Sequence, residues 1–229
     1  MQSPQSLTLM SKKLLHNLSV FFFLVSAWWC VANPNHDLML QLADSRYGSE
    51  AVKTLRAWQR LISVSQDNEP LETLEAVNRF FNQRIQFDED QRIWNQLDYW
   101  ATPLETMGRR QGDCEDFSIA KYVSLLLAGV PVEQLRMVYV KARVGSVDRK
   151  MTQAHMVLAY YPAPNADPLI LDNLDPRILP ASQRRDLIPV FSFNSAGLWI
   201  QDQVKPVGTA HNRLSRWRDL LHRMQAEGL

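Results

Sequence analysis

Apolar residues recur at helical spacing in three parts of the chain. Residues 38–61 carry spaced apolar side chains among polar ones, and a second stretch begins at Glu69 and keeps three-and-four spacing as far as Phe81. In residues 212–226 the apolar side chains share one face and the arginines lie elsewhere. The pattern predicts two helices packed on a core and a C-terminal amphipathic helix docked on its own domain.

One further stretch, residues 114–128, has little polar surface. A helix that is apolar on most of its circumference is typical of the centre of a domain. Gly129 and Pro131 end it, because glycine suits the position after the last turn and proline cannot continue a helix. We therefore expect a central buried helix that begins at Cys114.

Beyond this helix the pattern changes to the two-residue alternation of β-strands. Strands are predicted at residues 136–143, 154–161 and 169–172, and shorter ones at 187–193 and 197–200. Residues 145–150 are expected to form the loop between the first two strands, and residues 87–111 an irregular connection before the buried helix. Helices followed by a meandering antiparallel sheet indicate an α+β fold.

The first residues have the features of an export signal. Two lysines precede an apolar run at residues 18–29, which is shorter than the ~20 residues that a membrane-spanning helix needs. Ala32 is a small residue that offers a cleavage point. We expect a signal peptide at residues 1–32, with an uncleaved N-terminal anchor as the alternative, and a single domain at residues 33–229.

Charge and cysteine content narrow the function. The formal net charge is +1, and 25 basic residues balance 24 acidic ones, so we expect no nucleic-acid partner. Of the two cysteines, cleavage after Ala32 would remove Cys30 and leave Cys114 unpaired in a compartment where thiols form disulfides. An unpaired cysteine is either a small buried apolar residue or a functional thiol, and its neighbours must decide.

Those neighbours allow a catalytic triad. Asp113 is a good N-cap, so Cys114 would lie at the first helical position, where free N–H groups and the helix dipole favour a thiolate and can bind an oxyanion. His155 lies among apolar strand residues and needs a partner, and Asp172 ends the third strand. Taken alone, His155 is also typical of a hydrogen-bonded core histidine, and Asp172 of an aspartate in a turn. Together they indicate nucleophile, base and orienting acid.

Acidic residues surround the thiol. Asp113, Glu115 and Asp116 should oppose the ionisation of Cys114 by like-charge repulsion. A bound calcium ion would remove this conflict, because carboxylate oxygens are its preferred ligands and its charge would outweigh theirs. Acids in a first helical turn also complement the dipole without any metal. The residues alone leave both interpretations open.

Three segments, in this order, resemble a known family. Residues 112–117 read Gly-Asp-Cys-Glu-Asp-Phe, residues 154–157 Ala-His-Met-Val, and residues 171–174 Leu-Asp-Asn-Leu. They are similar to bacterial transglutaminase-like cysteine proteases of the LapG type, as is Tyr-Trp-Ala-Thr-Pro at residues 99–103. The resemblance extends over most of the chain after the signal and implies a papain-like, transglutaminase-like core, with the cysteine on a helix and the histidine and aspartate on the sheet.

The resemblance also implies an activity. It places calcium on Asp113, Glu115 and Asp116, and it implies calcium-dependent cleavage, in the periplasm, of a large surface adhesin near its N-terminus, typically at a pair of alanines. Such cleavage releases the adhesin and disperses a biofilm. It further implies an inner-membrane receptor that sequesters the protease when cyclic di-GMP is bound.

Other functions stay open on the sequence. Acyl transfer to an amine, as in true transglutaminases, uses the same thioester chemistry, and a Cys–His hydrolase can also cleave peptidoglycan peptides. A non-catalytic calcium-dependent binding module would keep the fold without the reaction. A zinc site with Cys114, His155 and a carboxylate is weakly supported, because a second cysteine or a close histidine pair of the usual spacing is lacking.

Overall fold

The computed structural model describes residues 34–145, 151–200 and 206–229. Helices come first: α1 (His36–Tyr47), α2 (Ser49–Ser65), α3 (Pro70–Arg84), α4 (Asp90–Ile93), α5 (Pro103–Arg109) and α6 (Cys114–Leu127). Two short strands pair in parallel: β1 (Gln86–Phe87), which follows α3, and β2 (Gln111–Gly112), which directly precedes α6. The described chain closes with the helices α7 (Ala210–Arg213) and α8 (Ser215–Ala226).

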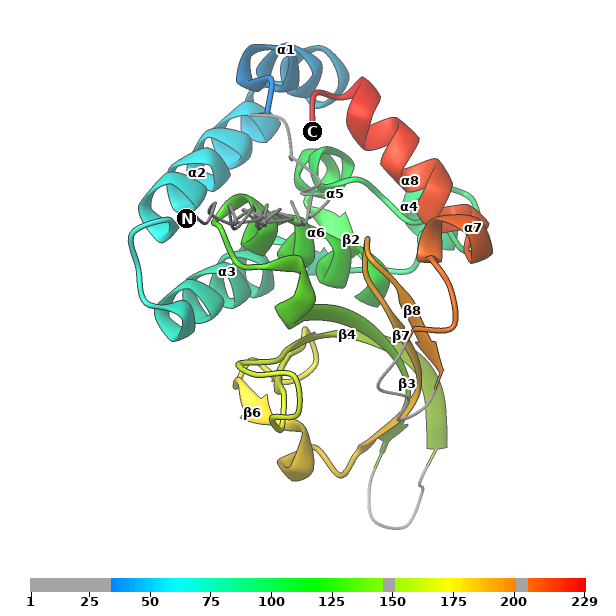
Figure 1. Ribbon diagram of the computed structural model, residues 1–229. Coiled ribbons are helices and arrows are strands. Elements are labelled where there is room, and N and C mark those ends of the chain that lie inside the picture. Colours follow the sequence, from blue (N-terminus) through cyan, green and yellow to red (C-terminus); the bar gives the residue numbers. More distant parts are fainter. Residues whose placement is uncertain (1–33, 146–150, 201–205) are drawn as a thin grey trace, which may run out of the picture. The chain divides into compact units, whose positions relative to one another are not determined.

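The main sheet has six strands in the order β6-β5-β4-β3-β7-β8, and every neighbouring pair is antiparallel. The strands are β3 (Leu135–Val144), β4 (Met151–Tyr160), β5 (Leu169–Leu171), β6 (Leu179–Pro180), β7 (Leu187–Phe193) and β8 (Leu198–Ile200). The helices gather on one side of β3 and β4, while the connection through β6 passes on the other (Figure 1). The predicted meander of three strands corresponds to β3, β4 and β5, and β7 and β8 extend the sheet beyond β3.

The two faces of β4 belong to different clusters of apolar side chains. Met156 and Leu158 face the helices and join the large core that includes Trp58 of α2 and Ile119 of α6. Val157 instead belongs to a smaller cluster on the opposite face of the sheet. The alternation predicted for this strand is confirmed, and α6 is buried against the sheet as its apolar circumference requires.

Two expected helices have different limits in the structure. The single helix predicted at 38–61 is wrong: Gly48, at φ +82°, separates α1 from α2, and its N–H donates to the carbonyl of Asp44 to close the first helix. The C-terminal helix α8 begins at Ser215, after the separate short helix α7.

The connection predicted to be irregular contains the regular helix α5. Thr102 and Glu105 form a reciprocal capping box there, and Pro103 occupies the first turn, where its missing N–H is not needed. A serine or threonine followed three residues later by glutamate is a recognised helix start, so this helix could have been predicted from the sequence.

Residues 1–33 and 146–150, which hold the predicted signal peptide and most of the first strand–strand loop, lie outside the described ranges. No helix within those ranges is both long enough and apolar enough to cross a lipid bilayer.

Candidate active site

The first turn of α6 places Cys114 at the N-terminus of the central helix. Asp113 is the N-cap: its Oδ1 accepts hydrogen bonds from the backbone N–H of Glu115 at 3.1 Å and of Asp116 at 3.3 Å. The capping is reciprocal, because Oδ2 of Asp116 accepts a hydrogen bond from the backbone N–H of Asp113 at 3.4 Å. The N-cap predicted for Asp113 is confirmed, and Cys114 is the first helical residue, partly buried.

Gly112 makes this tight turn possible. A Cβ atom at Gly112 would lie 2.8 Å from Cβ and 2.9 Å from Oδ2 of Asp116, closer than such atoms approach in proteins. Asp116 is fully buried, and moving it would break its hydrogen bonds with the N–H groups of Ala101 and Asp113. We expect Gly112→Ala to lower the free energy of unfolding by about 1–3 kcal/mol through this overlap. Chemical denaturation would measure it, and an unchanged midpoint would contradict the packing described.

The structure brings His155 and Asp172 together on neighbouring strands. Leu158 of β4 pairs with Leu171 of β5, so the next residue, Asp172, lies diagonally across from His155 on the same face. Nε2 of His155 lies 2.8 Å from Oδ1 of Asp172, and both side chains are buried. Oδ1 also accepts a hydrogen bond from the N–H of Leu174 at 3.0 Å.

The carboxyl group of Asp172 is held in its ionised form. Burial alone would raise its pKa, but the hydrogen bond and charge of His155, with further hydrogen bonds from Leu174 and Arg184, lower that pKa to about 2. An ionised carboxylate at this position accepts a hydrogen bond from the Nε2–H group of the imidazole. The geometry can therefore orient the ring and stabilise a positive charge on it.

Cys114 meets β4 next to His155. The backbone N–H of Met156 acts on the Cys114 thiol and lowers its pKa, and Oγ of Ser118, one turn further along α6, donates to the Met156 carbonyl at 3.1 Å. Nδ1 of His155 has no hydrogen-bond partner among the residues that the structure describes. The thiol itself donates to Oε2 of Glu115 at 2.7 Å.

The thiol is not activated by its present surroundings. Burial, then the charges of Glu115 and Asp113, raise the pKa of Cys114 well above its ordinary value, while the N–H of Met156 lowers it less. The helix N-terminus, expected to favour the thiolate, is thus outweighed by burial and the acidic neighbours. The conflict anticipated from the sequence is present in the structure.

A third buried acid joins the cluster. Ligand atoms of Asp90, Asp113 and Asp116 all lie within 4.8 Å of one another, and so do those of Asp113, Cys114 and Glu115. Asp113 therefore links a pair of buried aspartates to the thiol and Glu115. Asp90 was not predicted as a site residue, because it lies in α4, inside the connection expected to be irregular, and nothing in local spacing links it to a residue 23 positions later.

The acids lack a counter-charge. Burial, above all, raises the pKa of Asp90 to about 6, and burial with mutual repulsion raises the pKa of Asp113 and Asp116 as well. None of the three forms an ion pair with a lysine or arginine in the described ranges, and Oδ1 of Asp90 is buried without a hydrogen-bond partner there. Hard oxygen donors grouped without a cation fit a divalent ion such as calcium.

The segment before α5 wraps around these acids and is anchored by α8. The N–H groups of Tyr99 and Ala101 donate to Asp90 and Asp116, at 2.5 and 2.7 Å. From the other side, Nη2 of Arg223 donates to the carbonyl of Trp100 at 2.6 Å. The C-terminal helix thus supports the acidic cluster through this segment, which the helical pattern of the sequence did not indicate.

A thiol at the start of a buried helix, together with a buried histidine–aspartate pair on the antiparallel sheet against which that helix packs, is the residue set of a cysteine hydrolase with a transglutaminase-like α+β fold. Comparison with known families agrees. The profile of the bacterial transglutaminase-like cysteine proteinases matches residues 46–201, and the chain belongs to this family. The predictions of fold class and of a cysteine protease are confirmed.

Solved structures of LapG from Legionella pneumophila are similar over most of the chain. The EGTA-treated form is 40% identical at a TM-score of 0.72, and the match covers 84% of this chain and 100% of that one. The calcium-bound form is 40% identical at a TM-score of 0.69, covering 82% and 98%. No curated protein sequence matches the chain significantly.

Proposed function

We propose that this protein is a calcium-dependent cysteine endopeptidase in which Cys114 is the nucleophile, His155 the general base and Asp172 the orienting acid. The 2.8 Å contact between Nε2 of His155 and Oδ1 of Asp172 carries the proposal. It holds the ring by one nitrogen and leaves the other for the thiol proton, beside a cysteine at a helix start. Membership of a cysteine proteinase family supports it.

In the first half of the reaction, Nδ1 of His155 takes the proton of Cys114, and the thiolate attacks the carbonyl carbon of the scissile peptide bond. A C–S bond forms and the carbonyl π electrons move onto oxygen. Asp113 already occupies the N–H groups of Glu115 and Asp116, whereas the N–H of Cys114 has no acceptor among the described residues. That N–H is therefore the oxyanion donor offered by α6.

The imidazolium then protonates the leaving amine as the C–N bond breaks, and a thioester remains on Cys114. His155 next takes a proton from water, which attacks the thioester and releases the acid. The proton returns to sulfur and restores the thiol. Throughout, Asp172 keeps Nε2 protonated and stabilises the imidazolium, so the ring presents Nδ1 to the reacting atoms.

Calcium would be held by Asp113, Glu115 and Asp116, together with Asp90. Bound there, it supplies the positive charge that offsets the carboxylates around the thiol. Two observations support this assignment: the buried acids lack a counter-ion in the described ranges, and the similar Legionella pneumophila LapG has a calcium-bound structure. The assignment of Asp90 extends the set expected from the sequence.

Calcium should stabilise the folded protein. At a hundredfold excess over the dissociation constant, we expect calcium to raise the thermal unfolding temperature by about 5–10 °C relative to EGTA, because it binds only the folded cluster. Asp90→Asn should reduce this difference, whereas Asp67→Asn, an exposed turn residue, should not. Differential scanning fluorimetry measures both, and identical curves with calcium and EGTA would contradict the metal assignment.

We further propose that the substrate is a large surface adhesin, cut near its N-terminus at a pair of alanines in the periplasm, so that the adhesin is released and the biofilm disperses. Similarity to the LapG structures and the predicted signal peptide support this. Incubation of the purified protein with adhesin fragments, with calcium or EGTA, should give one calcium-dependent cut. Transfer of a labelled amine, or cleavage of peptidoglycan peptides instead, would favour the alternative reactions.

Control of the protease is proposed to rest on an inner-membrane receptor that binds it when cyclic di-GMP is present. Co-purification of the protein with membrane receptors of its host, with and without the nucleotide, tests this. Retention only with cyclic di-GMP is expected. Equal retention in both conditions would overturn this part of the proposal and leave the catalytic assignment untouched.

A further inference from the structure

Asp172 is held by a second side chain besides His155. Arg184 follows the 3₁₀ turn Ala181–Gln183, and its Nη2 donates to Oδ2 of Asp172 at 2.7 Å. The side chain of Arg184 is 5% exposed and that of Asp172 is fully buried. Both carboxylate oxygens are thus fixed, one by the imidazole and the other by the guanidinium.

Arg184 is itself fixed from the sheet. Its Nε and Nη2 donate to the two carboxylate oxygens of Asp186 at 3.0 and 2.8 Å, a two-point contact that sets the plane of the guanidinium. The carbonyl of Asp186 accepts from the N–H of Arg143 in β3 at 2.8 Å. A chain of contacts therefore runs from β3 through Asp186 and Arg184 to Asp172.

Among the described side chains, Arg184 is the donor to Oδ2 of Asp172. Lys121 of α6 is buried and its charge acts on Asp172, but it makes no hydrogen bond to that carboxylate among the described contacts. Without Arg184, a buried carboxylate oxygen would have no donor and the group could rotate toward other partners. Rotation would weaken the contact that holds Nε2 of His155.

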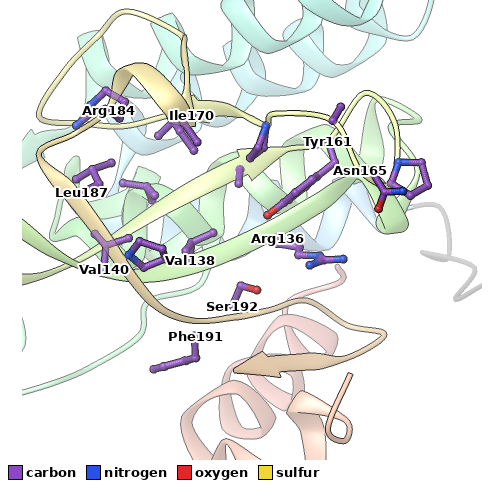
Figure 2. Close-up of a pocket in the computed structure, with 17 residues that line it drawn as sticks. Arg136, Val138, Val140, Tyr161, Asn165, Ile170, Arg184, Leu187, Phe191 and Ser192 are labelled. Carbon is purple, nitrogen blue, oxygen red and sulfur yellow. The ribbon is translucent and has the colours of Figure 1, made fainter. Parts of the chain in front are cut away.

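Stability alone does not explain this arginine. Nη1 of Arg184 is buried without a hydrogen-bond partner in the described ranges, and buried ion pairs often contribute less to stability than apolar side chains of similar size. Arg184 also lies at one end of a cavity of about 540 Å³, beside Ile170 and Leu187 (Figure 2). That space allows a methionine at this position to adjust, so a folded variant is expected.

We propose that Arg184 is a positioning residue of the triad: it fixes the Asp172 carboxylate so that His155 keeps its Nε2–H tautomer and ring orientation. The inference rests on the proposed triad. Arg184 donates to Asp172 and Asp186 and to no atom of Cys114 or His155, so its loss should reduce turnover and leave substrate binding intact.

The test uses a peptide that spans the cut mapped in the adhesin. Arg184→Met should lower kcat about 10- to 100-fold, with KM within about twofold, because the base is misplaced and the binding surface is not. Arg184→Lys, which can restore one charged hydrogen bond but not the two-point contact, should recover part of kcat. Arg177→Met, an exposed arginine paired with Asp175 in the same connection, is the matched control and should keep wild-type kinetics.

A double-mutant cycle separates positioning from a general structural effect. In an Asp172→Asn background, Arg184→Met should cause no further loss, since the arginine acts through that carboxylate. Equal losses in both backgrounds, or unchanged kcat in folded Arg184→Met, would overturn the inference. If circular dichroism shows that Arg184→Met is unfolded, the kinetics of Asp186→Asn, which loosens Arg184, are measured instead. A lower kcat at constant KM in that variant supports positioning, and an unchanged kcat overturns it. Wild-type cleavage by Cys114→Ala would instead refute the triad itself.

Discussion

Cys114→Ala is expected to reduce cleavage of the adhesin fragment by at least about 10³-fold, since no thioester can form without the sulfur. The fold should survive, because Cys114 is only partly buried and its removal leaves the Asp113 cap intact. Cleavage is measured by gel densitometry with enzyme in excess, so that slow residual turnover remains visible.

Calcium-dependent stabilisation serves as the control for this variant. Cys114→Ala should keep the wild-type shift in unfolding temperature between calcium and EGTA, because the carboxylates are unchanged. Full cleavage by the variant would refute the nucleophile assignment. Lost cleavage with unaltered release of the adhesin from cells would favour the binding module over the protease.

Asp172→Asn is expected to lower kcat by roughly 10²- to 10⁴-fold. The neutral amide can turn its NH2 group toward Nε2 and donate to it, so the ring can adopt the wrong tautomer, and the imidazolium loses its negatively charged partner. Arg184 would also lose the acceptor it now reaches at 2.7 Å. Steady-state kinetics with the same peptide measure the effect.

Asp175→Asn is the matched control for this prediction. Asp175 lies in the same turn and pairs with the exposed Arg177 rather than with His155. It should keep kcat within about twofold of wild type, as expected for a surface ion pair. Equal losses in the two variants would mean that the turn, rather than the Asp172 carboxylate, sustains activity.

Much of the site follows from local patterns in the sequence. Asp113 caps a helix because its side chain reaches the free N–H groups of the first turn. Two-residue alternation places His155 and Met156 on different faces of the sheet. The antiparallel pairing of β4 with β5 then places Asp172 on the same face as His155. These are rules of short range or of simple strand geometry, so one sequence is enough to apply them.

The rest depends on contacts between distant segments. Asp90 reaches the acidic cluster only because α4 folds over the start of α6, and Arg184 reaches Asp172 only through the connection after β6. Neither residue has a periodic pattern or motif that points to its partner. The break between α1 and α2 is different, because its cause is local: Gly48 has a positive φ. The apolar residues keep helical spacing on both sides of Gly48, so their pattern did not reveal the break.

The central claim is that Cys114 forms the thioester intermediate of a calcium-dependent protease. Acid quenching of the reaction with the adhesin fragment, followed by peptide mass spectrometry, tests it most directly. We expect the N-terminal product attached to Cys114 in calcium and no such adduct in EGTA or in Cys114→Ala. An adduct on another residue, or undiminished cleavage by Cys114→Ala, would contradict it.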